Sequence, residues 1–391
     1  MAVKVLTIIG TRPEAIKLFP VIHALEADPR FESRVCVTGQ HREMVDRVLE
    51  MATVTSDHDL MATQGCQSLD ALTALLLAGL GAVLDTEAAE WVVVQGDTTS
   101  ALCGALAAYY RQIAVCHVEA GLRSGDIHHP WPEEGNRRII SAVASLHFAP
   151  TAASARALEL ENIPPSAVHV TGNTVIDALQ WVVGRSKECP QMATKVAEIE
   201  TRCADKFIIG VTAHRRESFG AGMLMIADAI RQLASRNDVA IVFPLHPNPN
   251  VRNIMLAELG DIENVILLEP LDYPNFVRLV SISHLMLTDS GGLQEEAPFL
   301  GTPVLVMRET TERPEGLEAG TAKLVGTNPD RIVAEVEKLL ADADAYGRMA
   351  RAHNPFGDGR AAERIVELLA GTLRSDQAAG SKMCPHMPMS A

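Results

Sequence analysis

The sequence predicts an α/β protein with two domains, each built around a parallel β-sheet. The chain has 391 residues, which at about 150 residues per domain suggests two separate cores. Apolar residues make up 47% of the chain and aromatic residues only 4%, so aliphatic side chains dominate, as they do in layered α/β proteins. Short β-type runs also alternate with Ala- and Leu-rich helical stretches, which is the pattern of repeated βαβ units.

Each strand is predicted from a short aliphatic run. The run WVVVQ at 91–95 is apolar until its last residue, as expected for a strand that is buried on both faces. The strands predicted in the first half are 4–9, 34–38, 91–95 and 113–118, with weaker candidates at 146–149 and 168–170. Those predicted in the second half are 207–212, 239–244, 265–268, 285–288 and 303–306.

The boundary between the domains is predicted near 171–175, where Thr-Gly-Asn precedes a charged helical stretch. Residues 1–172 are therefore expected to form the first domain and residues 173–357 the second. An amphipathic helix is predicted at 358–374, and residues 375–391 are expected to be a disordered tail because they are rich in Gly, Pro, Met and Ser.

Charge and cysteine usage exclude several classes of protein. The net charge of −15 argues against nucleic-acid binding, which needs a basic face. Seven scattered cysteines without a Cys-x-x-Cys pair favour reduced thiols in the cytoplasm. The apolar start is predicted to be a first strand rather than a signal peptide. The longest apolar run, 71–84, is shorter than the roughly 20 residues of a membrane span, so no membrane association is expected.

Ligands of parallel sheets bind beyond the carboxyl ends of the strands, so the residues that follow each strand are the candidate site. The first strand runs into GTRPEAIK, where Pro13 suits the first turn of a helix. Arg12 and Lys17 are placed to face a cleft, although a solvated basic helix start would look the same. This segment lacks the Gly-x-Gly-x-x-Gly fingerprint of dinucleotide-binding sites, so no nicotinamide cofactor is expected.

Three carboxylates follow neighbouring strands of the first domain: Asp97 in GDTTS, Glu119 in HVEAGLR and Glu133 in PWPEEGNRR. Burial and mutual repulsion at one sheet edge would raise one or more of their pKa values, as general acid–base catalysis requires. For Asp97 alone, an equally good interpretation is an N-cap of the next helix. No metal is expected, because no His-rich spacing accompanies these carboxylates.

The second half offers an anion site. DSGGLQEE follows the strand at 285–288 and opens a helix, so Ser290, Gly291 and Gly292 would present backbone N–H groups to a phosphate. A plain capped glycine turn is the alternative. Glu296 is placed to accept hydrogen bonds from ribose hydroxyls. His214 and Arg313, on nearby strand-end loops, would add further polar contacts, whereas His246 between prolines is equally well explained as a turn residue.

The motifs together resemble those of the non-hydrolysing UDP-N-acetylglucosamine (UDP-GlcNAc) 2-epimerases. The resemblance runs in order from about residue 4 to 330. It is carried by GTRPEAIKL, TGQH, GDTTS, HVEAGLR, PWPEEGNRR, GNTVIDAL, TAHRRES, HPNP and DSGGLQEEAPFLGTPVLVMRETTERPEG.

This resemblance implies a glycosyltransferase-B-like fold of two Rossmann-like domains, with the C-terminal helix crossing back to the first domain. It implies a homodimer that interconverts UDP-GlcNAc and UDP-N-acetylmannosamine (UDP-ManNAc) without a cofactor and supplies precursors of cell-surface polysaccharides. By motif, the acid–base residues are Asp97, Glu119 and Glu133, joined in catalysis by His214. The implied nucleotide-sugar contacts are Arg12, Lys17, Phe276 (near the uracil), Ser290, Gly291, Gly292, Glu296 and Arg313.

The resemblance also implies a second, activating UDP-GlcNAc that contacts Gln40 and His41. Two positions depart from some relatives: Leu271 stands where they have Gln, and Cys66 stands where they have a basic residue. The first departure puts a side-chain contact at Leu271 in doubt, and the second puts the regulation in doubt.

The implied chemistry is elimination of UDP to a glycal followed by re-addition, because the hydrogen on C2 of the sugar is not acidic. The sequence does not assign the carboxylates to the two faces of the sugar. Hydrolysis of the same substrate, glycosyl transfer and a nucleotide-sugar sensor without activity are the rival interpretations. The intact PWPEE segment and the presence of all three carboxylates disfavour the first and the last of them, and no segment argues for the acceptor site of a transferase.

Overall fold

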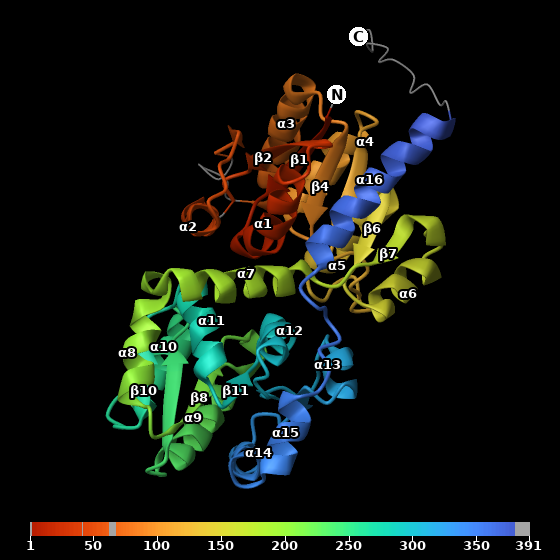
Figure 1. Cartoon of the computed structure of the whole chain (residues 1–391). Helices are drawn as coiled ribbons and strands as arrows, with labels where there is room; N and C mark the ends of the chain where they lie inside the picture. The colour runs from red at the N-terminus through yellow and green to blue at the C-terminus, as the bar shows by residue number, and fades with distance from the viewer. Residues whose placement is uncertain (1, 41, 62–67, 380–391) are drawn as a thin grey trace.

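The structure is a computed structural model that describes residues 2–40, 42–61 and 68–379. It contains two parallel β-sheets with helices on both faces, one in each half of the molecule (Figure 1). The helix α7 (Thr174–Glu188) lies between the halves, and α16 (Ala361–Ala379) returns from the second half to the first.

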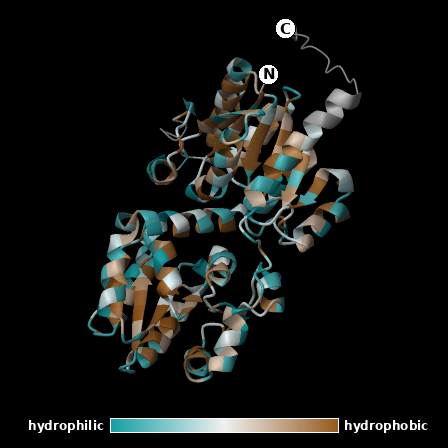
Figure 2. Ribbon diagram, in the orientation of Figure 1, coloured by the Kyte–Doolittle hydropathy of each residue, from teal (hydrophilic) through white to brown (hydrophobic). Residues whose placement is uncertain are grey.

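The first sheet has seven strands in the order β3-β2-β1-β4-β5-β6-β7, and all of its neighbouring pairs are parallel. Its strands are β1 (Val3–Ile9), β2 (Phe31–Val37), β3 (His58–Asp59), β4 (Trp91–Gln95), β5 (Ala114–Val118), β6 (Leu146–Ala149) and β7 (Val168–Val170). Its helices are α1 (Arg12–Glu26), α2 (Arg42–Ala52), α3 (Leu69–Glu87), α4 (Thr99–Tyr109), α5 (Glu133–Val143) and α6 (Ala152–Leu160). The central strands are hydrophobic along most of their length (Figure 2), because helices cover both of their faces.

The second sheet has six parallel strands in the order β10-β9-β8-β11-β12-β13. Its strands are β8 (Phe207–Thr212), β9 (Val239–Pro244), β10 (Val265–Leu268), β11 (Leu285–Thr288), β12 (Val304–Val306) and β13 (Ala322–Leu324). Its helices are α8 (Thr194–Arg202), α9 (Ala221–Ala234), α10 (Pro249–Leu259), α11 (Tyr273–Ile282), α12 (Gly291–Phe299), α13 (Pro314–Glu318), α14 (Pro329–Ala341) and α15 (Ala343–Ala350).

The two sheets share one topology, which confirms the predicted class of two Rossmann-like domains. In each sheet the strand order reverses direction at one point, between β1 and β4 in the first and between β8 and β11 in the second. Such switch points leave a crevice beyond the strand ends, where ligands of these folds bind. A ligand site is therefore expected at the loops that follow these four strands.

The chain crosses between the halves at two points that touch each other. The first crossing is Gly172–Asn173 and the second is Phe356–Gly357, and the backbone N–H of Asn173 donates to the carbonyl of Phe356 at 2.7 Å. Gly172 has φ of +90°, and a Cβ added there would lie 3.3 Å from the Cα of Gly357. Glycine therefore meets both the backbone conformation and the close approach that this junction requires.

The C-terminal helix packs against α1 and α7, and its buried side chains Ile365 and Leu369 join the core of the first half. Its start is fixed by Asp177 of α7, whose carboxylate accepts the backbone N–H groups of Ala361 at 3.2 Å and Ala362 at 2.8 Å. The helix continues to Ala379, so it is longer than predicted and includes the first residues of the predicted tail. Residues 380–391 lie outside the described residues.

Helix α3 differs from the sequence-based expectation. Within the described part of the chain it is the one helix long and apolar enough, by length and composition, to cross a membrane, with a mean hydropathy of 1.6 and only 28% of the window buried. The run at 71–84 had appeared too short, but the helix spans 19 residues. Core helices of water-soluble proteins pass the same test, and α3 packs along α4.

Candidate active site

Glu14 is hydrogen-bonded to both loops of the first switch point, the one that follows β1 and the one that follows β4. Its carboxylate accepts the backbone N–H groups of Thr11 at 2.6 Å and Gly10 at 3.2 Å, and the Thr98 hydroxyl donates to it at 2.8 Å. The side chain is 1% exposed, and burial raises the pKa of Glu14 to about 7. A Cβ on Gly10 would lie 2.1 Å from the Ser100 hydroxyl, so only glycine fits where the two loops meet.

Glu119 follows β5 and lies in a dense hydrogen-bond network. Lys17 of α1 donates to both carboxylate oxygens, at 2.6 and 2.7 Å, and the amides of Gln95 and Asn173 donate as well. Burial alone would raise the pKa of Glu119. The positive charges of Lys17 and Arg313 lower it by more, so that the pKa lies below its ordinary value. Its φ of +62° is uncommon for a side-chain-bearing residue and typical of constrained functional positions.

Asp97 follows β4 and pairs with Arg137 of α5. The Asn136 side chain donates to the Asp97 carbonyl at 2.8 Å, which fixes the backbone beside it. Burial raises the pKa of Asp97 above its ordinary value, although Arg137 acts in the opposite direction. The N-cap of α4 is Thr98, so the alternative role of Asp97 as a helix cap is wrong.

The two glutamates of the PWPEE segment have different environments. Glu134 is fully buried and pairs with Arg138 at 3.0 Å and Arg137 at 3.4 Å. Glu133 opens α5, and its Oε2 is buried without a hydrogen-bond partner among the described residues. Glu134 is thus occupied in holding the segment, whereas Glu133 keeps an acceptor for a ligand.

His214 lies at the second switch point, after β8. Its Nδ1 is 3.2 Å from Asp289 of the β11 loop, whose carboxylate also accepts the backbone N–H groups of His214 and Arg215. The His246 ring stacks on His214 at 5.6 Å, so His246 contributes to the site rather than only to a turn. Burial lowers the pKa of His214 more than Asp289 raises it, so the imidazole is neutral and donates through one nitrogen.

The start of α12 is arranged for an anion. Ser290 is its N-cap, yet the Ser290 side chain makes no capping hydrogen bond. A Cβ on Gly291 would lie 3.6 Å from Nη2 of Arg215, which places this guanidinium beside the helix N-terminus. The Arg215 Nε is buried without a hydrogen-bond partner in the described part of the chain. Gly292 is exposed at the same turn. Backbone N–H groups, the helix dipole and a cation therefore share one site.

Charged residues of the two halves influence each other across the cleft. Burial, and then Glu295, raise the pKa of Glu296 to about 7, while Lys17 and Arg12 of α1 act to lower it. Arg313 pairs with Glu295, which is only 2% exposed. Arg12 and Lys17 of the first half thus lie near Glu296 and Arg313 of the second.

Phe276, Leu271 and Gln40 are the remaining predicted positions that the structure describes. Phe276 of α11 is partly buried between two apolar clusters, and Leu271 is buried in one of them, so Leu271 offers packing rather than a polar contact. The Ser100 hydroxyl donates to the Gln40 side chain at 2.8 Å. His41 and Cys66 lie outside the described residues.

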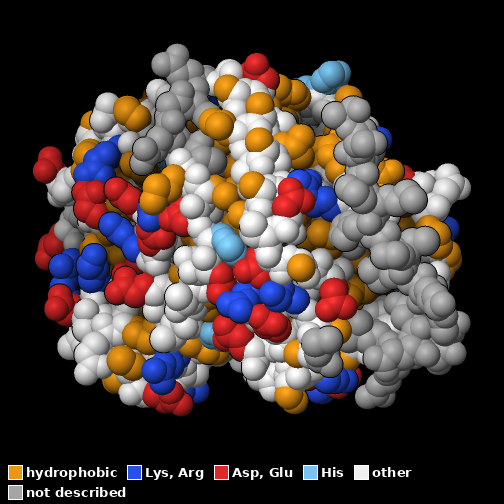
Figure 3. Space-filling view, turned by 90° about the horizontal axis from the view of Figure 1, so that it is seen from above, with side chains coloured by type: hydrophobic (Ala, Val, Ile, Leu, Met, Phe, Trp, Pro, Cys, Tyr) orange, Lys and Arg blue, Asp and Glu red, His pale blue; other side chains and the backbone are white. Residues whose placement is uncertain are grey.

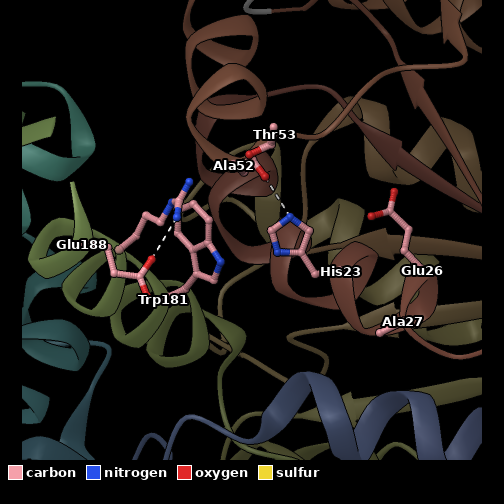
Figure 4. Close-up of a pocket in the computed structure, with 8 residues that line it drawn as sticks. His23, Glu26, Ala27, Ala52, Thr53, Trp181 and Glu188 are labelled. Atoms are coloured by element: carbon pink, nitrogen blue, oxygen red, sulfur yellow. Dashed lines mark hydrogen bonds and ion pairs between the residues drawn. The ribbon is translucent and has the colours of Figure 1, made fainter.

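A separate cavity of about 510 Å³ lies between α1, the end of α2 and α7 (Figure 4). The His23 and Trp181 rings approach there to 5.7 Å, and His23 Nε2 is 2.8 Å from the Ala52 carbonyl. None of the predicted site residues lines it. The lining residues are His23, Glu26, Ala27, Ala52, Thr53, Trp181, Arg185 and Glu188.

Comparison with known proteins shows the family of this chain. A sequence profile of the family described as UDP-N-acetylglucosamine 2-epimerase matches residues 23–370. The chain belongs to this family. The UDP-N-acetylglucosamine 2-epimerase of Salmonella typhimurium is 52% identical over 368 residues, which cover 94% of this chain and 98% of that protein.

Solved structures of family members are also similar. UDP-GlcNAc 2-epimerase from Neisseria meningitidis, bound to UDP-GlcNAc, is 45% identical with a TM-score of 0.86, over 94% of this chain and 100% of that chain. The enzyme of Methanocaldococcus jannaschii, in complex with UDP-GlcNAc and UDP, is 33% identical with a TM-score of 0.79, over 94% of this chain and 99% of that one.

For this member of the UDP-N-acetylglucosamine 2-epimerase family, sequence reasoning missed the partners of the carboxylates. Arg137, Asn173 and Glu295 all lie in motifs that carry the resemblance, but none of the three was predicted to contact a catalytic carboxylate. Arg215, adjacent to His214, was the cation nearest the predicted anion site. Residue types gave the signal in each case, but the pairings depend on segments far apart in the chain. Among the described residues no cluster suited to a metal ion is present.

Proposed function

We propose that this chain interconverts UDP-GlcNAc and UDP-ManNAc by inverting the configuration at C2 of the sugar. The observation that carries the proposal is that Glu119 of the first half lies close to Arg313 of the second half, with Asp97 near Glu119. A nucleotide diphosphate at the start of α12 would place its sugar toward these carboxylates. The bound UDP-GlcNAc of the N. meningitidis relative supports this substrate class.

Departure of UDP makes the C2 hydrogen removable, because positive character then develops at the anomeric carbon. Negative charge meanwhile accumulates on the diphosphate. Arg12, Arg215, Arg313 and the N-terminus of α12 stabilise this charge. The Nδ1–H of His214 faces Asp289, so His214 donates to the diphosphate through Nε2 only once the imidazole is protonated. Preorganised donors of this kind are among the largest contributions to catalysis. The intermediate is a glycal, to which UDP adds again.

The carboxylates then exchange protons on the two faces of the sugar. The pKa of Glu119 lies below its ordinary value and that of Asp97 above it, so Glu119 is ionised and suits a base, while Asp97 retains a proton more readily. Opposite pKa shifts in one site commonly distinguish an acid from a base. Glu133, with its unpaired oxygen, provides the third proton-transfer group.

The experiment is proton NMR of UDP-GlcNAc incubated with the purified protein in deuterated water. Intact UDP-ManNAc carrying deuterium at C2 is the expected product. Free ManNAc and UDP would reveal a hydrolase instead, and unchanged substrate with retained UDP binding would indicate a sensor. Glu119→Gln is the matched variant, which should bind UDP and yet leave C2 without deuterium.

We further propose that the chain is a homodimer joined through α3. The outward face of α3 carries exposed apolar residues at helical spacing (Ala71, Ala74, Leu75, Ala78 and Ala82), where a solvent-facing helix would carry polar ones. The neighbouring α4 adds the exposed Tyr109 and Tyr110. Hydrophobic side chains are scattered among charged ones on the face seen from above (Figure 3).

Light scattering tests this arrangement. Leu75→Glu should convert a dimer into a monomer, whereas Leu160→Glu, at another exposed leucine, should leave it dimeric. A parent protein that is monomeric in solution would contradict the proposal, and one that sediments with lipid vesicles would assign α3 to a membrane surface instead.

A second UDP-GlcNAc acting as an activator is also proposed, with Gln40 and His41 as its contacts. Gln40 is linked through Ser100 to the loop that carries Asp97, which supplies a short route to the active site. The test measures the rate at which pure UDP-ManNAc is converted. Traces of added UDP-GlcNAc should raise this initial rate if UDP-GlcNAc is an activator. We propose that the enzyme acts in the cytoplasm and supplies precursors of cell-surface polysaccharides. Its free thiols at Cys36, Cys103 and Cys116 suit a reducing compartment.

A further inference from the structure

We propose that Asn173 is a positioning residue that makes the hydrogen bonding of Glu119 depend on the position of the second half of the molecule. The hydrogen bonds of Asn173 are given by the structure, whereas their expected effect on catalysis rests on the proposed epimerase function. Asn173 lies at the first crossing between the halves, and it is 2% exposed.

The side-chain amide of Asn173 bridges the two halves with a single nitrogen. Its Nδ2 donates to Oε1 of Glu119 at 3.1 Å and to Oε2 of Glu295 at 2.6 Å. Glu119 follows a strand of the first sheet, whereas Glu295 belongs to α12, which packs on the second sheet. The two hydrogens of one NH₂ group therefore serve carboxylates from opposite sides of the cleft.

Each of these carboxylates is held by a cation of its own half. Glu119 pairs with Lys17, and Glu295 pairs with Arg313. The result is an unbroken chain of contacts from Lys17 through Glu119, Asn173 and Glu295 to Arg313. One outer member, Arg313, is a residue assigned to the diphosphate, so that binding at that end is connected to the proposed base.

Asparagine suits this position better than similar residues. Its Oδ1 accepts the Val175 N–H at 3.1 Å and caps α7, so every polar function of the side chain is used. Aspartate would place a third carboxylate between Glu119 and Glu295, and repulsion would raise their pKa values. Serine would keep the cap, but its single hydroxyl hydrogen cannot serve two acceptors.

The Asn173 bridge also lies where the chain crosses between the two halves. The Asn173 N–H is bonded to Phe356 of the second crossing, so the backbone of Asn173 stays in place when the halves move. Separation of the halves would carry Glu295 away and leave the amide free to turn from Glu119. Glu119 would thus receive its full set of donors only in the closed state, in which water is excluded from the reacting sugar.

The test compares Asn173→Ser with a matched control, Asn354→Ser. Asn354 is also buried and donates to Glu295, but to the backbone carbonyl, at 3.1 Å. Asn173→Ser should lower kcat at least about 10-fold, the effect of losing a hydrogen bond to a charged group, with KM changed less than about threefold. The acid limb of the pH profile should move to higher pH, because the lost donor normally lowers the pKa of Glu119.

A direct readout keeps the proposal independent of the activity. Titration of the Glu119 carboxyl by ¹³C NMR, in protein labelled at glutamate and assigned with Glu119→Gln, should show a higher pKa in Asn173→Ser and an unshifted one in Asn354→Ser. Equal pKa values in the parent and in Asn173→Ser would overturn the positioning role, and so would equal shifts in both serine variants. Failure of the parent to epimerise would contradict the proposed function but leave this titration decisive for Asn173.

Discussion

Glu14 at the start of α1 and Glu119 after β5 are both buried carboxyls of the first half. Their surroundings nevertheless shift their pKa values in opposite directions. Glu14 is surrounded by neutral donors, so burial dominates and its pKa rises to about 7. Glu119 touches the Lys17 ammonium, which outweighs burial and lowers its pKa. A buried carboxyl therefore becomes an acid or a base according to the charge of one neighbour.

The raised pKa of Glu14 makes stability depend on pH. The folded protein binds this proton more tightly than the unfolded chain does, whose ordinary pKa is 4.5. The favourable contribution is fully present below pH 4.5 and is lost as the pH rises through 7. Glu14→Gln should remove this loss. We expect it to gain about 3 kcal/mol relative to the parent between pH 4.5 and 8.

Urea unfolding across this pH range measures the gain. Glu26→Gln, at an exposed position of the same helix, should keep the pH slope of the parent. Parallel curves for the parent and Glu14→Gln would mean that Glu14 is already ionised at low pH.

Arg215 and Arg216 form an internal comparison. Arg215 lies against the start of α12, whereas Arg216 is exposed. Arg215→Met should weaken UDP binding about 10- to 100-fold, the effect of one charge-assisted hydrogen bond. Calorimetric titration with UDP should show a change of less than about twofold for Arg216→Met. Equal losses in both variants would assign the effect to net charge rather than to contact.

At the scale of elements, the site depends on where helices begin. The helices α1, α4 and α12 each start directly after a strand at a switch point. A different kind of start occurs at α16, where Asp177 of another helix accepts two of the first N–H groups. This contact holds the last helix to the first half.

Asp177→Ala should therefore loosen α16. Loss of the two acceptors is expected to cost about 1–2 kcal/mol and to speed hydrogen exchange at the first turn of the helix. Asp358→Ala removes an exposed pair with Arg364 at the same end of the helix, and should cost less than about 1 kcal/mol. Faster exchange in Asp358→Ala than in Asp177→Ala would show that the surface pair holds the helix instead.

The sequence was most informative about these elements where one residue type dominates. The continuous aliphatic runs located the strands of both sheets, and the fold class followed from their alternation with helices. The edge strands β3 and β13 were missed, because a two-residue His-Asp strand and an Ala-Lys-Leu strand carry no apolar pattern. Strand ends also indicated the candidate site residues, but pairs such as Arg137 with Asp97 are decided only when distant segments pack.

At the scale of the whole molecule, like charges converge from both halves. Arg12 and Lys17 belong to the first half, and Arg215 and Arg313 to the second. Lys17 and Arg313 are already paired with Glu119 and Glu295, so a bound diphosphate would act chiefly by attracting Arg12 and Arg215 from the two halves. We therefore expect the unliganded protein to be more open than the UDP complex.

Small-angle X-ray scattering should show a smaller radius of gyration on addition of UDP. Arg215→Met at the same UDP concentration should show little change, because it binds the nucleotide weakly. Superimposable profiles of the parent with and without saturating UDP would contradict closure.

The return of α16 to the first half also has a consequence for synthesis on the ribosome. The buried residues of α16 (Ala362, Ile365, Val366, Leu369 and Ala370) complete a core whose other buried members all lie before residue 280. That core stays uncovered until almost the whole chain has emerged, although the N-terminal half of a multidomain protein generally folds first. Nascent chains that stop short of α16 would leave this apolar core exposed and would be bound by chaperones. The first half can therefore complete its folding only after the C-terminal helix has been synthesised.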